Sequence, residues 1–515
     1  MMRAPAFTSP LEASIYVEGL RARPAFFVAA LLVAHAAIWT LVAWLGNPTP
    51  DPKLTIGLAL GHEWQLGYIA TPPLAPWILE IAYQAGGLVA IYALGPTCVA
   101  LAGWFVFLLA RRIAGDRHGA LAVFLMVGVH PVAFPIGAFD SDLVQMPLVA
   151  LAVLAWWFAV VERNRVAWIV LGVACGVLAY AGVQGLFVLV TLLLLTGATP
   201  VGRAAVSENQ DQIFAVSGLF VFTLLLTPRM IWLQNHGFAG AMQDFDLPVG
   251  EIARVDALGA GATVLLGHIG MLLLVALGSR YLAKDQDIAP VFMRPELLPF
   301  GKLVGIVLAL VPPLLALVAA FLLGNRYPST AAAPLVLYSG LLVVVLAGEA
   351  LRVHRQRQVA VAGLTLLFLP PALELATAYA SPFFGDVGRS TNWPAREAAR
   401  YITDVYRTRT GKPLEFVVGE DVMASSIALL SRDRPHVFID ANPAVAPWAD
   451  REKLESRGGV VVWRIRGPNA PPPASLTANL PPITAESPLT LRWVRSGNLD
   501  FERLGWAIVS PKPAQ

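Results

Sequence analysis

The chain alternates between long apolar runs and short polar connectors over its first 380 residues. A helix that crosses a bilayer needs about 20 consecutive apolar residues. We therefore predict a polytopic α-helical membrane protein with about eleven transmembrane helices, near 25–46, 88–110, 119–133, 143–160, 166–181, 184–198, 213–227, 259–279, 303–323, 331–350 and 359–380. The runs at 119–133 and 184–198 are shorter than the others, so ten or twelve helices also fit.

The connectors carry their positive charges unevenly. If the N-terminus lies in the cytoplasm and the helices alternate, the inner connectors hold 16 Lys and Arg residues and the outer ones hold four. Because Lys and Arg gather on the cytoplasmic side of membrane proteins, we expect a cytoplasmic N-terminus and a periplasmic C-terminal region. The first apolar run follows more than twenty mixed residues without a small-residue cleavage site, so we expect a membrane anchor rather than a cleaved signal peptide.

Residues 381–515 follow a different pattern, in which charged residues return. Strand-like runs occur at Leu414–Gly419, His436–Asp440, Gly459–Arg464, Leu489–Val494 and Leu504–Val509. Helical spacing occurs in Trp393–Arg409 and Met423–Leu430. Strands that alternate with helices are typical of an α/β domain. We therefore divide the chain into a transmembrane domain at 1–380, with a long first outer loop at 46–87, and a small periplasmic α/β domain at 381–515.

The composition agrees with a membrane protein. Hydrophobic residues make up 57% of the 515 positions and charged residues 14%, against about 25% charged in soluble domains. The mean hydropathy is +0.64. These values exclude a soluble protein, a disordered chain and a nucleic-acid-binding platform. Cys98 and Cys175 both lie inside apolar runs, so we predict neither a disulfide framework nor a Cys/His metal cluster.

The first outer loop is long for a connector, and its polar residues include Asp51, Lys53, His62, Glu63, Gln65, Tyr68 and Glu80. Within it, Leu74, Trp77, Ile78 and Ile81 recur with helical spacing, and Glu80 lies on another side. This pattern predicts an amphipathic helix in the membrane interface with Trp77 at headgroup depth. The alternative is a re-entrant connector with no further role.

Two other outer loops contain candidate ligand residues. Asp140 and Asp142 stand at the start of an apolar helix, where capping and the helix dipole explain one acid better than two. Arg229 could hold a lipid phosphate through paired hydrogen bonds, or its side chain could extend to the interface. Arg326 is a second candidate, and His236 is either a ligand or a solvated histidine. Acids, cations and aromatic residues on one face suit a cleft for a lipid-linked anionic substrate.

Two segments resemble the family 39-like glycosyltransferases, which are related to protein O-mannosyltransferases and to the lipid A aminoarabinose transferase. Residues 67–77 (GYIATPPLAPW) are similar to the G-Y-x-x-x-P-P-L-x-x-W segment of that family's first outer loop. Residues 228–238 resemble its later P-x-x-x-W-L…H-x-F segment. The resemblance implies a C-type glycosyltransferase fold and an enzyme that takes a sugar from a polyprenyl phosphate at the outer face, generally with inversion. An acid of the first outer loop would then act as the base.

The sequence departs from the family pattern at two places. The family's Asp-Glu pair falls on Lys53-Leu54 here, and its Glu-Lys before the two prolines is Ala70-Thr71. We therefore expect Asp51 to be the base, with Asp140 or Asp142 positioning the base or the acceptor. Glu63, Asp140 and Asp142 are the alternatives for the base, and a catalytically silent binding or scaffold member stays open.

We predict a bacterial inner-membrane glycosyltransferase, a hexosyl- or pentosyltransferase, acting on a lipid or glycan acceptor on the periplasmic face. We assign the donor phosphate to Arg229, Arg326 and Lys53, and the substrate pocket to Tyr68, Trp77 and His236. Whether a divalent metal serves as cofactor stays open. The competing class is a transporter or flippase of lipid-linked sugars, which would need polar residues near the bilayer centre. A polymerase or ligase that uses the same type of donor is a third option.

Overall fold

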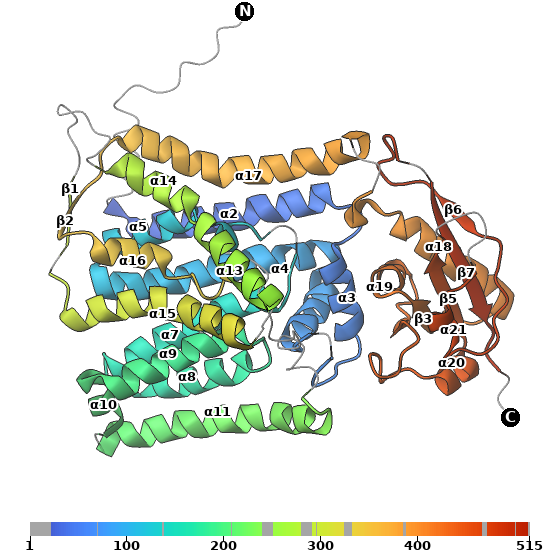
Figure 1. The fold of residues 1–515 in the computed structure, drawn as a ribbon, viewed down its shortest axis with the longest axis horizontal. Helices are drawn as coiled ribbons and strands as arrows, with labels where there is room; N and C mark the ends of the chain where they lie inside the picture. The colour runs from blue at the N-terminus through green and yellow to red at the C-terminus, as the bar shows by residue number, and fades with distance from the viewer. Residues whose placement is uncertain are drawn as a thin grey trace, which may run out of the picture.

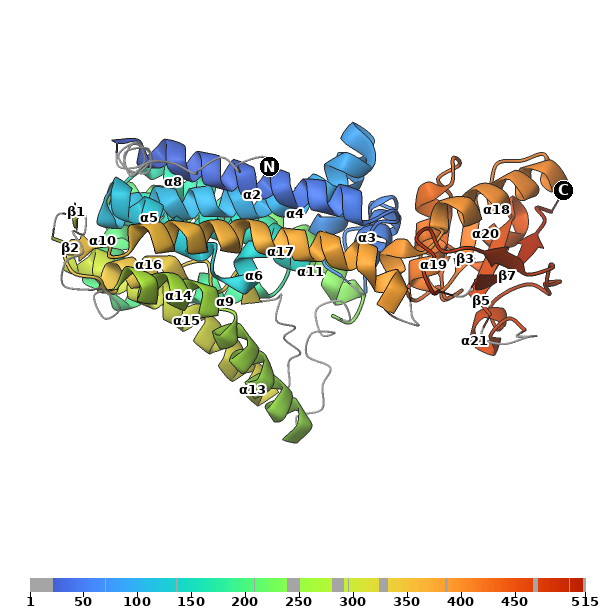
Figure 2. The same cartoon turned by 90° about the horizontal axis from the view of Figure 1, so that it is seen from above.

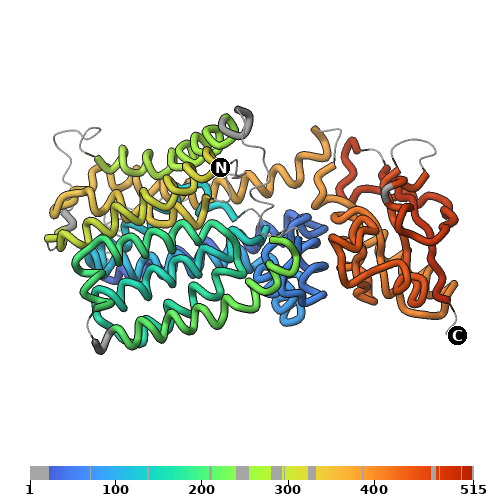
Figure 3. The backbone as a smooth tube through the Cα atoms, turned by 60° about the horizontal axis from the view of Figure 1, so that its bottom comes forward, coloured from blue at the N-terminus to red at the C-terminus, as the bar shows by residue number. Residues whose placement is uncertain are grey.

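The computed structural model describes residues 22–69, 71–135, 138–207, 209–238, 251–279, 291–294, 296–323, 332–384, 388–465, 471–499 and 501–512. They form a helical bundle that ends at Phe384 and a separate mixed unit, at residues 388–512, that we call the α/β unit (Figure 1). Figure 3 shows the two parts side by side, with an early helical segment of the bundle at the boundary between them.

The bundle is built almost entirely from helices. A short two-stranded antiparallel sheet, β1 (Val291–Met293) with β2 (Ala350–Arg352), joins two of its connectors. The described helices are α2 (Pro24–Gly46), α3 (Pro52–Gly61), α4 (Leu74–Ala114), α5 (Asp116–Met126), α6 (His130–Ala133), α7 (Ser141–Val160), α8 (Arg165–Leu178), α9 (Gln184–Ala198), α10 (Pro200–Ser207), α11 (Asn209–Asn235), α13 (Glu251–Leu266), α14 (Ile269–Gly278), α15 (Pro299–Leu323), α16 (Ser339–Leu346) and α17 (Gln356–Phe384).

Seven stretches in the described part of the chain are long and apolar enough to cross a membrane, or eight if the bent pair α9 and α10 is one span. The seven are Pro24–Gly46, Leu74–Ala114, Ser141–Val160, Gln212–Asn235, Val255–Gly278, Pro299–Leu322 and Gln356–Phe384. The chain is therefore a multi-pass membrane protein, but the predicted count of eleven is not confirmed. The predicted spans at 119–133, 166–181 and 331–350 fall on α5, α8 and α16, which have 11, 14 and 8 residues.

Close backbone packing explains why one of these helices is short. After α5 ends at Met126, Gly128 lies directly against the backbone of Gly270 and Met271 in α14. A side chain at Gly128 would have no room, and the amide of Met271 donates a hydrogen bond to the Gly128 carbonyl at 2.9 Å. The apolar run thus continues in the sequence while the helix does not, because the chain turns to make this crossing.

Helix α4 contains a break at Gly86 and Gly87. Gly87 has φ = +61°, a left-handed conformation that glycine adopts without steric cost. The break separates the segment that starts at Leu74 from the long apolar part that ends at Ala114. This boundary agrees with the predicted division between an amphipathic helix and a span near 88–110.

The α/β unit contains one five-stranded sheet with strand order β4-β3-β5-β7-β6. The strands are β3 (Phe416–Gly419), β4 (His436–Ile439), β5 (Gly459–Arg464), β6 (Leu489–Leu491) and β7 (Glu502–Val509). β3 pairs in parallel with β4 and β5, whereas β7 is antiparallel to both β5 and β6. Each lies at a run that the sequence predicted as a strand.

Helices cover both faces of this sheet. Helices α18 (Ala395–Thr410) and α19 (Asp421–Leu430) pack on one face, through residues such as Ile402 and Ile427. Helices α20 (Arg451–Arg457) and α21 (Ala474–Thr477) pack on the other, where Leu454 and Leu476 are buried. The α18–α19 face also shares its apolar core with Leu60 and Tyr68 of the bundle. The α/β unit therefore rests on α3 and the loop after it (Figure 2).

Candidate active site

Helix α3 lies at the edge of the bundle beside the α/β unit (Figures 1 and 2), and Asp51 and Lys53 stand at its N-terminal end. Asp51 is the N-cap of α3, and its carboxylate accepts a hydrogen bond from the Lys53 amide at 3.0 Å. Pro52 follows at the first helical position, which suits proline because that amide has no intrahelical partner. This local sequence holds the Asp51 carboxylate at the end of a short, buried helix.

Helix α7 begins in the same way and lies against α3 through one ion pair. Asp140 caps α7 by accepting hydrogen bonds from the amides of Asp142 and Leu143 at 3.1 and 3.2 Å. The Lys53 ammonium lies 2.5 Å from the Asp140 carboxylate. Asp142, in the first turn of α7, is buried with 7% of its surface exposed. We call Asp51, Lys53, Asp140 and Asp142 the α3–α7 cluster.

The charges of the cluster act on one another. Burial raises the pKa of Asp51 above its ordinary value, and the Lys53 amide and ammonium offset this only in part. Burial opposes the charged form of Lys53, yet the carboxylates of Asp140, Asp142 and Asp51 raise the pKa of its ammonium. Lys53 is thus charged, while Asp51 is a carboxylate with enhanced proton affinity, as a general base requires.

A further cation, in the linker between the bundle and the α/β unit, acts on this cluster through its charge. Arg389 interacts electrostatically with Asp51, where its charge favours the carboxylate. Its guanidinium lies 2.5 Å from Glu374 near the end of α17. No sequence pattern connects Glu374 with Arg389, and Arg389 belongs to no recognised motif. The only sequence signal was a basic residue close to the boundary between the two parts of the chain.

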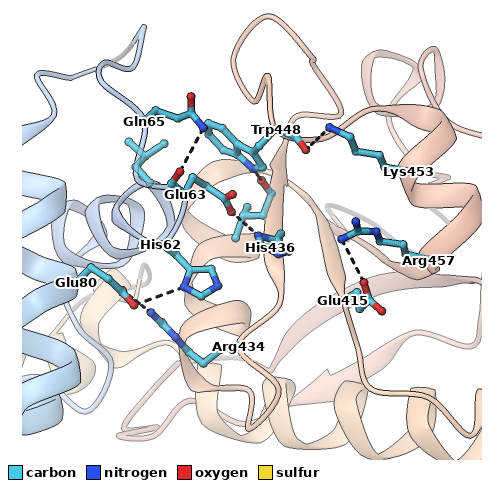
Figure 4. Close-up of polar contacts among 12 residues, drawn as sticks. His62, Glu63, Gln65, Glu80, Glu415, Arg434, His436, Trp448, Lys453 and Arg457 are labelled. Carbon is cyan, nitrogen blue, oxygen red and sulfur yellow. Dashed lines mark hydrogen bonds and ion pairs between the residues drawn. The ribbon is translucent and has the colours of Figure 1, made fainter. Parts of the chain in front are cut away.

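Glu63 and Glu80 lie at the end of α3 opposite to the cluster, because α3 ends at Gly61 and Gly61 packs against Glu80. There both acids contact the α/β unit (Figure 4). Ten helical residues separate the two ends by about 15 Å. Glu63 contacts His436 of the α/β unit at 2.7 Å. Glu80, with 3% of its side chain exposed, contacts Arg434 at 2.7 Å and His62 at 3.5 Å. The structure therefore does not bring Glu63 together with the other candidate acids, and these contacts form the junction of the two parts.

The aromatic residues of the proline-containing motif hold the loop after α3. Tyr68 is buried, and its hydroxyl donates to the Leu60 carbonyl at 2.6 Å and accepts from the Gln65 amide at 3.1 Å. The Trp77 indole donates to the Gln65 carbonyl at 3.0 Å. In the described structure both polar groups bond the loop itself. Their assignment to a substrate pocket stays a prediction.

Arg229 lies beneath the same loop. Its guanidinium donates to the Leu66 carbonyl at 3.1 Å and stacks over Trp232, 4.9 Å from the ring centre. Only 4% of Arg229 is exposed. His236 stacks on the same indole at 4.2 Å and bonds the Trp232 carbonyl. Arg326, the second predicted phosphate ligand, lies outside the described residues.

The residues 22–512 that the structure describes, apart from its gaps, include no group of three or more His, Cys, Asp or Glu side chains arranged to hold a metal ion. In the α3–α7 cluster, the Lys53 ammonium supplies the positive charge beside the carboxylates.

Comparisons with known proteins agree with this architecture. Residues 70–232 match the family described as dolichyl-phosphate-mannose-protein mannosyltransferase. A lipid A galacturonosyltransferase, RgtD from Rhizobium johnstonii, is 27% identical over 179 residues. That match covers 33% of this chain and 36% of the relative, so the chain aligns with about a third of the relative's length.

The solved structure of ArnT from Cupriavidus metallidurans bound to undecaprenyl phosphate matches with a TM-score of 0.59 at 12% identity. The match covers 95% of this chain and 99% of ArnT, so the two share a fold. The chain therefore has the C-type glycosyltransferase fold in a multi-pass membrane protein. Together with the family match, this confirms the resemblance to the family 39-like glycosyltransferases.

Proposed function

We propose that the protein transfers a sugar from a polyprenyl-phosphate donor to a lipid or glycan acceptor on the periplasmic face of a bacterial inner membrane. The observation that carries this proposal is the α3–α7 cluster, in which a carboxylate of raised pKa lies beside cations. The matched ArnT structure holds undecaprenyl phosphate, and the matched RgtD is a lipid A galacturonosyltransferase. These names support a lipid-linked donor and an envelope lipid acceptor.

Asp51 is the proposed general base. Its carboxylate takes the proton of the acceptor hydroxyl while the hydroxyl oxygen attacks the anomeric carbon of the donor sugar. The bond between that carbon and the phosphate oxygen breaks, and polyprenyl phosphate leaves with the electron pair. A single displacement of this kind inverts the anomeric configuration. Asp140 is less suited to the same role because two backbone amides and the Lys53 ammonium already neutralise it.

The donor phosphate is assigned to Lys53 and Arg389. The Lys53 side chain is about half exposed, and its ammonium has three donors, of which Asp140 takes one. Arg389 is the other cation whose charge reaches Asp51. Cations at this position stabilise negative charge as it develops on the leaving phosphate. Arg229 is instead assigned to holding the loop at Leu66, because its guanidinium is almost fully buried and already bonded there.

The proposed orientation follows from charge. Helices α5 and α10 lie at the end of the bundle farthest from the α/β unit (Figures 1 and 2). They carry Arg117 and Arg203, two of the cations in the connectors predicted to be cytoplasmic. The α3–α7 cluster lies at the other end. A cytoplasmic N-terminus and a periplasmic α/β unit are consistent with this distribution.

Purified protein in proteoliposomes, supplied with radiolabelled undecaprenyl-phosphate sugars and extracted envelope lipids, tests the proposal. We expect label to move to an acceptor with release of undecaprenyl phosphate. Movement of intact donor between leaflets without release would instead favour a flippase. Recovery of unchanged donor under every condition would favour a silent binding member.

The phosphate assignment is tested in the same vesicles. We expect Lys53→Met and Arg389→Met each to weaken binding of undecaprenyl phosphate by about tenfold or more, because a hydrogen bond to a charged group contributes about 1.5–3 kcal/mol. Arg451→Met, which removes an exposed arginine on α20, is the matched control and should leave binding unchanged. Equal binding by all three variants would contradict the assignment.

A further inference from the structure

The α/β unit contains a polar cavity that the proposed reaction does not use. It has a volume of about 300 Å³ and is lined by residues that include Ser390, Trp393, Ser426, Arg464, Trp493 and Glu502. This volume is at the lower end of the range for small-molecule sites, about 300–1,000 Å³. The cavity therefore suits a ligand of roughly one sugar ring.

The cavity lies where α/β sheets commonly bind ligands. From β3 the chain passes through α19 to β4, which pairs with one edge of β3. It then returns to β5, which pairs with the other edge of β3, so the order of the strands changes direction at β3. In open α/β sheets, ligands bind outside the carboxyl ends of the strands at such a change of direction. Arg464 is the last residue of β5, and Ser426 is on α19, which follows β3.

The side chains around the cavity combine aromatic surface with balanced charge. Arg464 and Glu502 are its two charged lining residues, and they pair at 3.2 Å. The cavity thus carries no net charge, which does not favour a phosphate or another anion. A planar cation beside a carboxylate supplies both donors and acceptors, as neighbouring sugar hydroxyls require.

Two tryptophans, Trp393 and Trp493, contribute aromatic surface to the cavity. The Trp493 ring packs directly against Gly388, where a Cβ atom would lie 2.4 Å from the ring. Trp393 is 6% exposed, and its indole N–H is buried without a hydrogen-bond partner among the described residues. A buried donor left unpaired costs about 1–3 kcal/mol, and other atoms of Trp393 line the cavity.

Hydrogen bonds connect the cavity to the segment that carries Asp51. The Thr49 amide donates to the Thr391 carbonyl at 3.0 Å, and the Thr49 hydroxyl donates to the Trp393 carbonyl at 2.6 Å. Asp51 lies two residues further on, within about 7 Å along the chain. Arg389, whose charge acts on Asp51, stands between the lining residues Gly388 and Ser390.

We propose that this cavity binds a neutral sugar residue of the acceptor and thereby directs an acceptor hydroxyl towards Asp51. The assignment to the acceptor rests on the proposed function, whereas the binding of a neutral sugar does not. The donor sugar is attached to a phosphate, which is assigned to Lys53 and Arg389 outside the cavity.

Saturation-transfer NMR on the full-length protein in nanodiscs tests binding directly, with methyl glycosides of neutral hexoses, pentoses and N-acetylhexosamines as probes. We expect at least one probe to bind, and Arg464→Met to weaken it about tenfold or more. Ser390→Trp, which adds bulk at an exposed rim position, should do the same without disturbing the core. Arg451→Met, which removes a similarly exposed arginine from another ion pair, should change nothing.

Absence of binding by every probe would overturn the proposal, as would binding that Arg464→Met and Ser390→Trp leave unchanged. Tighter binding of methyl galacturonoside or a sugar phosphate would overturn the assignment to a neutral ligand.

In the transfer assay, we expect Arg464→Met to raise KM for the acceptor and not for the donor; the reverse result would assign the cavity to the donor sugar. Release of undecaprenyl phosphate by a protein that binds no glycoside would refute only this proposal. Glycoside binding without any transfer would refute only the proposed function.

Discussion

Replacing Arg434 by methionine should loosen the junction between the bundle and the α/β unit. Arg434 contacts Glu80 at 2.7 Å (Figure 4). Its guanidinium also lies 4.4 Å from the centre of the Tyr83 ring. The Glu80 side chain is 3% exposed, so the variant leaves its carboxylate buried without a full positive charge beside it. Breaking such a pair typically costs about 3–5 kcal/mol. His62 and Gln84 remain as partners of Glu80, and Arg434 is 22% exposed, so we expect about 2–3 kcal/mol.

Hydrogen exchange of peptides that cover α3 and β4 measures this effect. A loss of 2–3 kcal/mol corresponds to roughly 30- to 150-fold faster exchange, since about 1.4 kcal/mol is tenfold. Arg451→Met breaks an exposed pair within α20 and should cost about 0.5 kcal/mol or less. Adding Glu80→Gln to Arg434→Met removes the uncompensated charge and should recover part of the loss. Equal exchange in Arg434→Met and Arg451→Met would refute the reasoning.

Three further predictions concern other contacts. The hydrogen bond with Glu63 raises the pKa of His436 above its ordinary 6.5. This contact should therefore stabilise the junction fully below pH 6.5, and the stabilisation should be lost as pH rises through the higher pKa of the folded protein. Hydrogen exchange of β4 should become faster over that pH range, and His436→Gln should remove the pH dependence. Gly67→Ala places a Cβ atom 2.1 Å from the Arg229 guanidinium and should cost about 1–3 kcal/mol, whereas Gly197→Ala, with open space around it, should leave the Tm unchanged or slightly raised. Lys53→Met removes a charge that lowers the pKa of Asp51, so the acid limb of the transfer rate should move to higher pH; an unmoved limb would exclude Asp51 as the titrating group.

Local patterns predicted much of the architecture. The run GVVVWR at 459–464 became β5 with the predicted limits, because a continuous run of β-branched and aromatic residues suits a strand that is buried on both faces. Asp140 caps α7 as expected of an acid before an apolar helix. Membrane spans were harder to count, since an apolar run can continue through a turn. The run at 119–133 shows this, where Gly128 crosses the backbone of α14.

The grouping of the charged residues required the tertiary structure. Lys53 and Asp140 are 87 positions apart, and Glu80 and Arg434 are 354 apart, so no local pattern connects them. Glu80 was expected on the polar side of an amphipathic helix; its side chain is instead buried and contacts Arg434 of the α/β unit. In the sequence, Lys53 stands where the family has an acidic residue, which suggested that an acid had been lost. In the structure, the Lys53 ammonium lies among the carboxylates of the cluster.

The transfer rate of Asp51→Asn, compared with Glu63→Gln at saturating donor, tests the role of the α3–α7 cluster most directly. General-base catalysis contributes about 10²–10⁴-fold, so we expect Asp51→Asn to lose about that factor while it still binds undecaprenyl phosphate. Glu63→Gln alters a contact at the far end of α3 and should stay within a few-fold of the unmodified protein. Full transfer by Asp51→Asn, with activity lost in Glu63→Gln or Asp142→Asn, would contradict the assignment of the base.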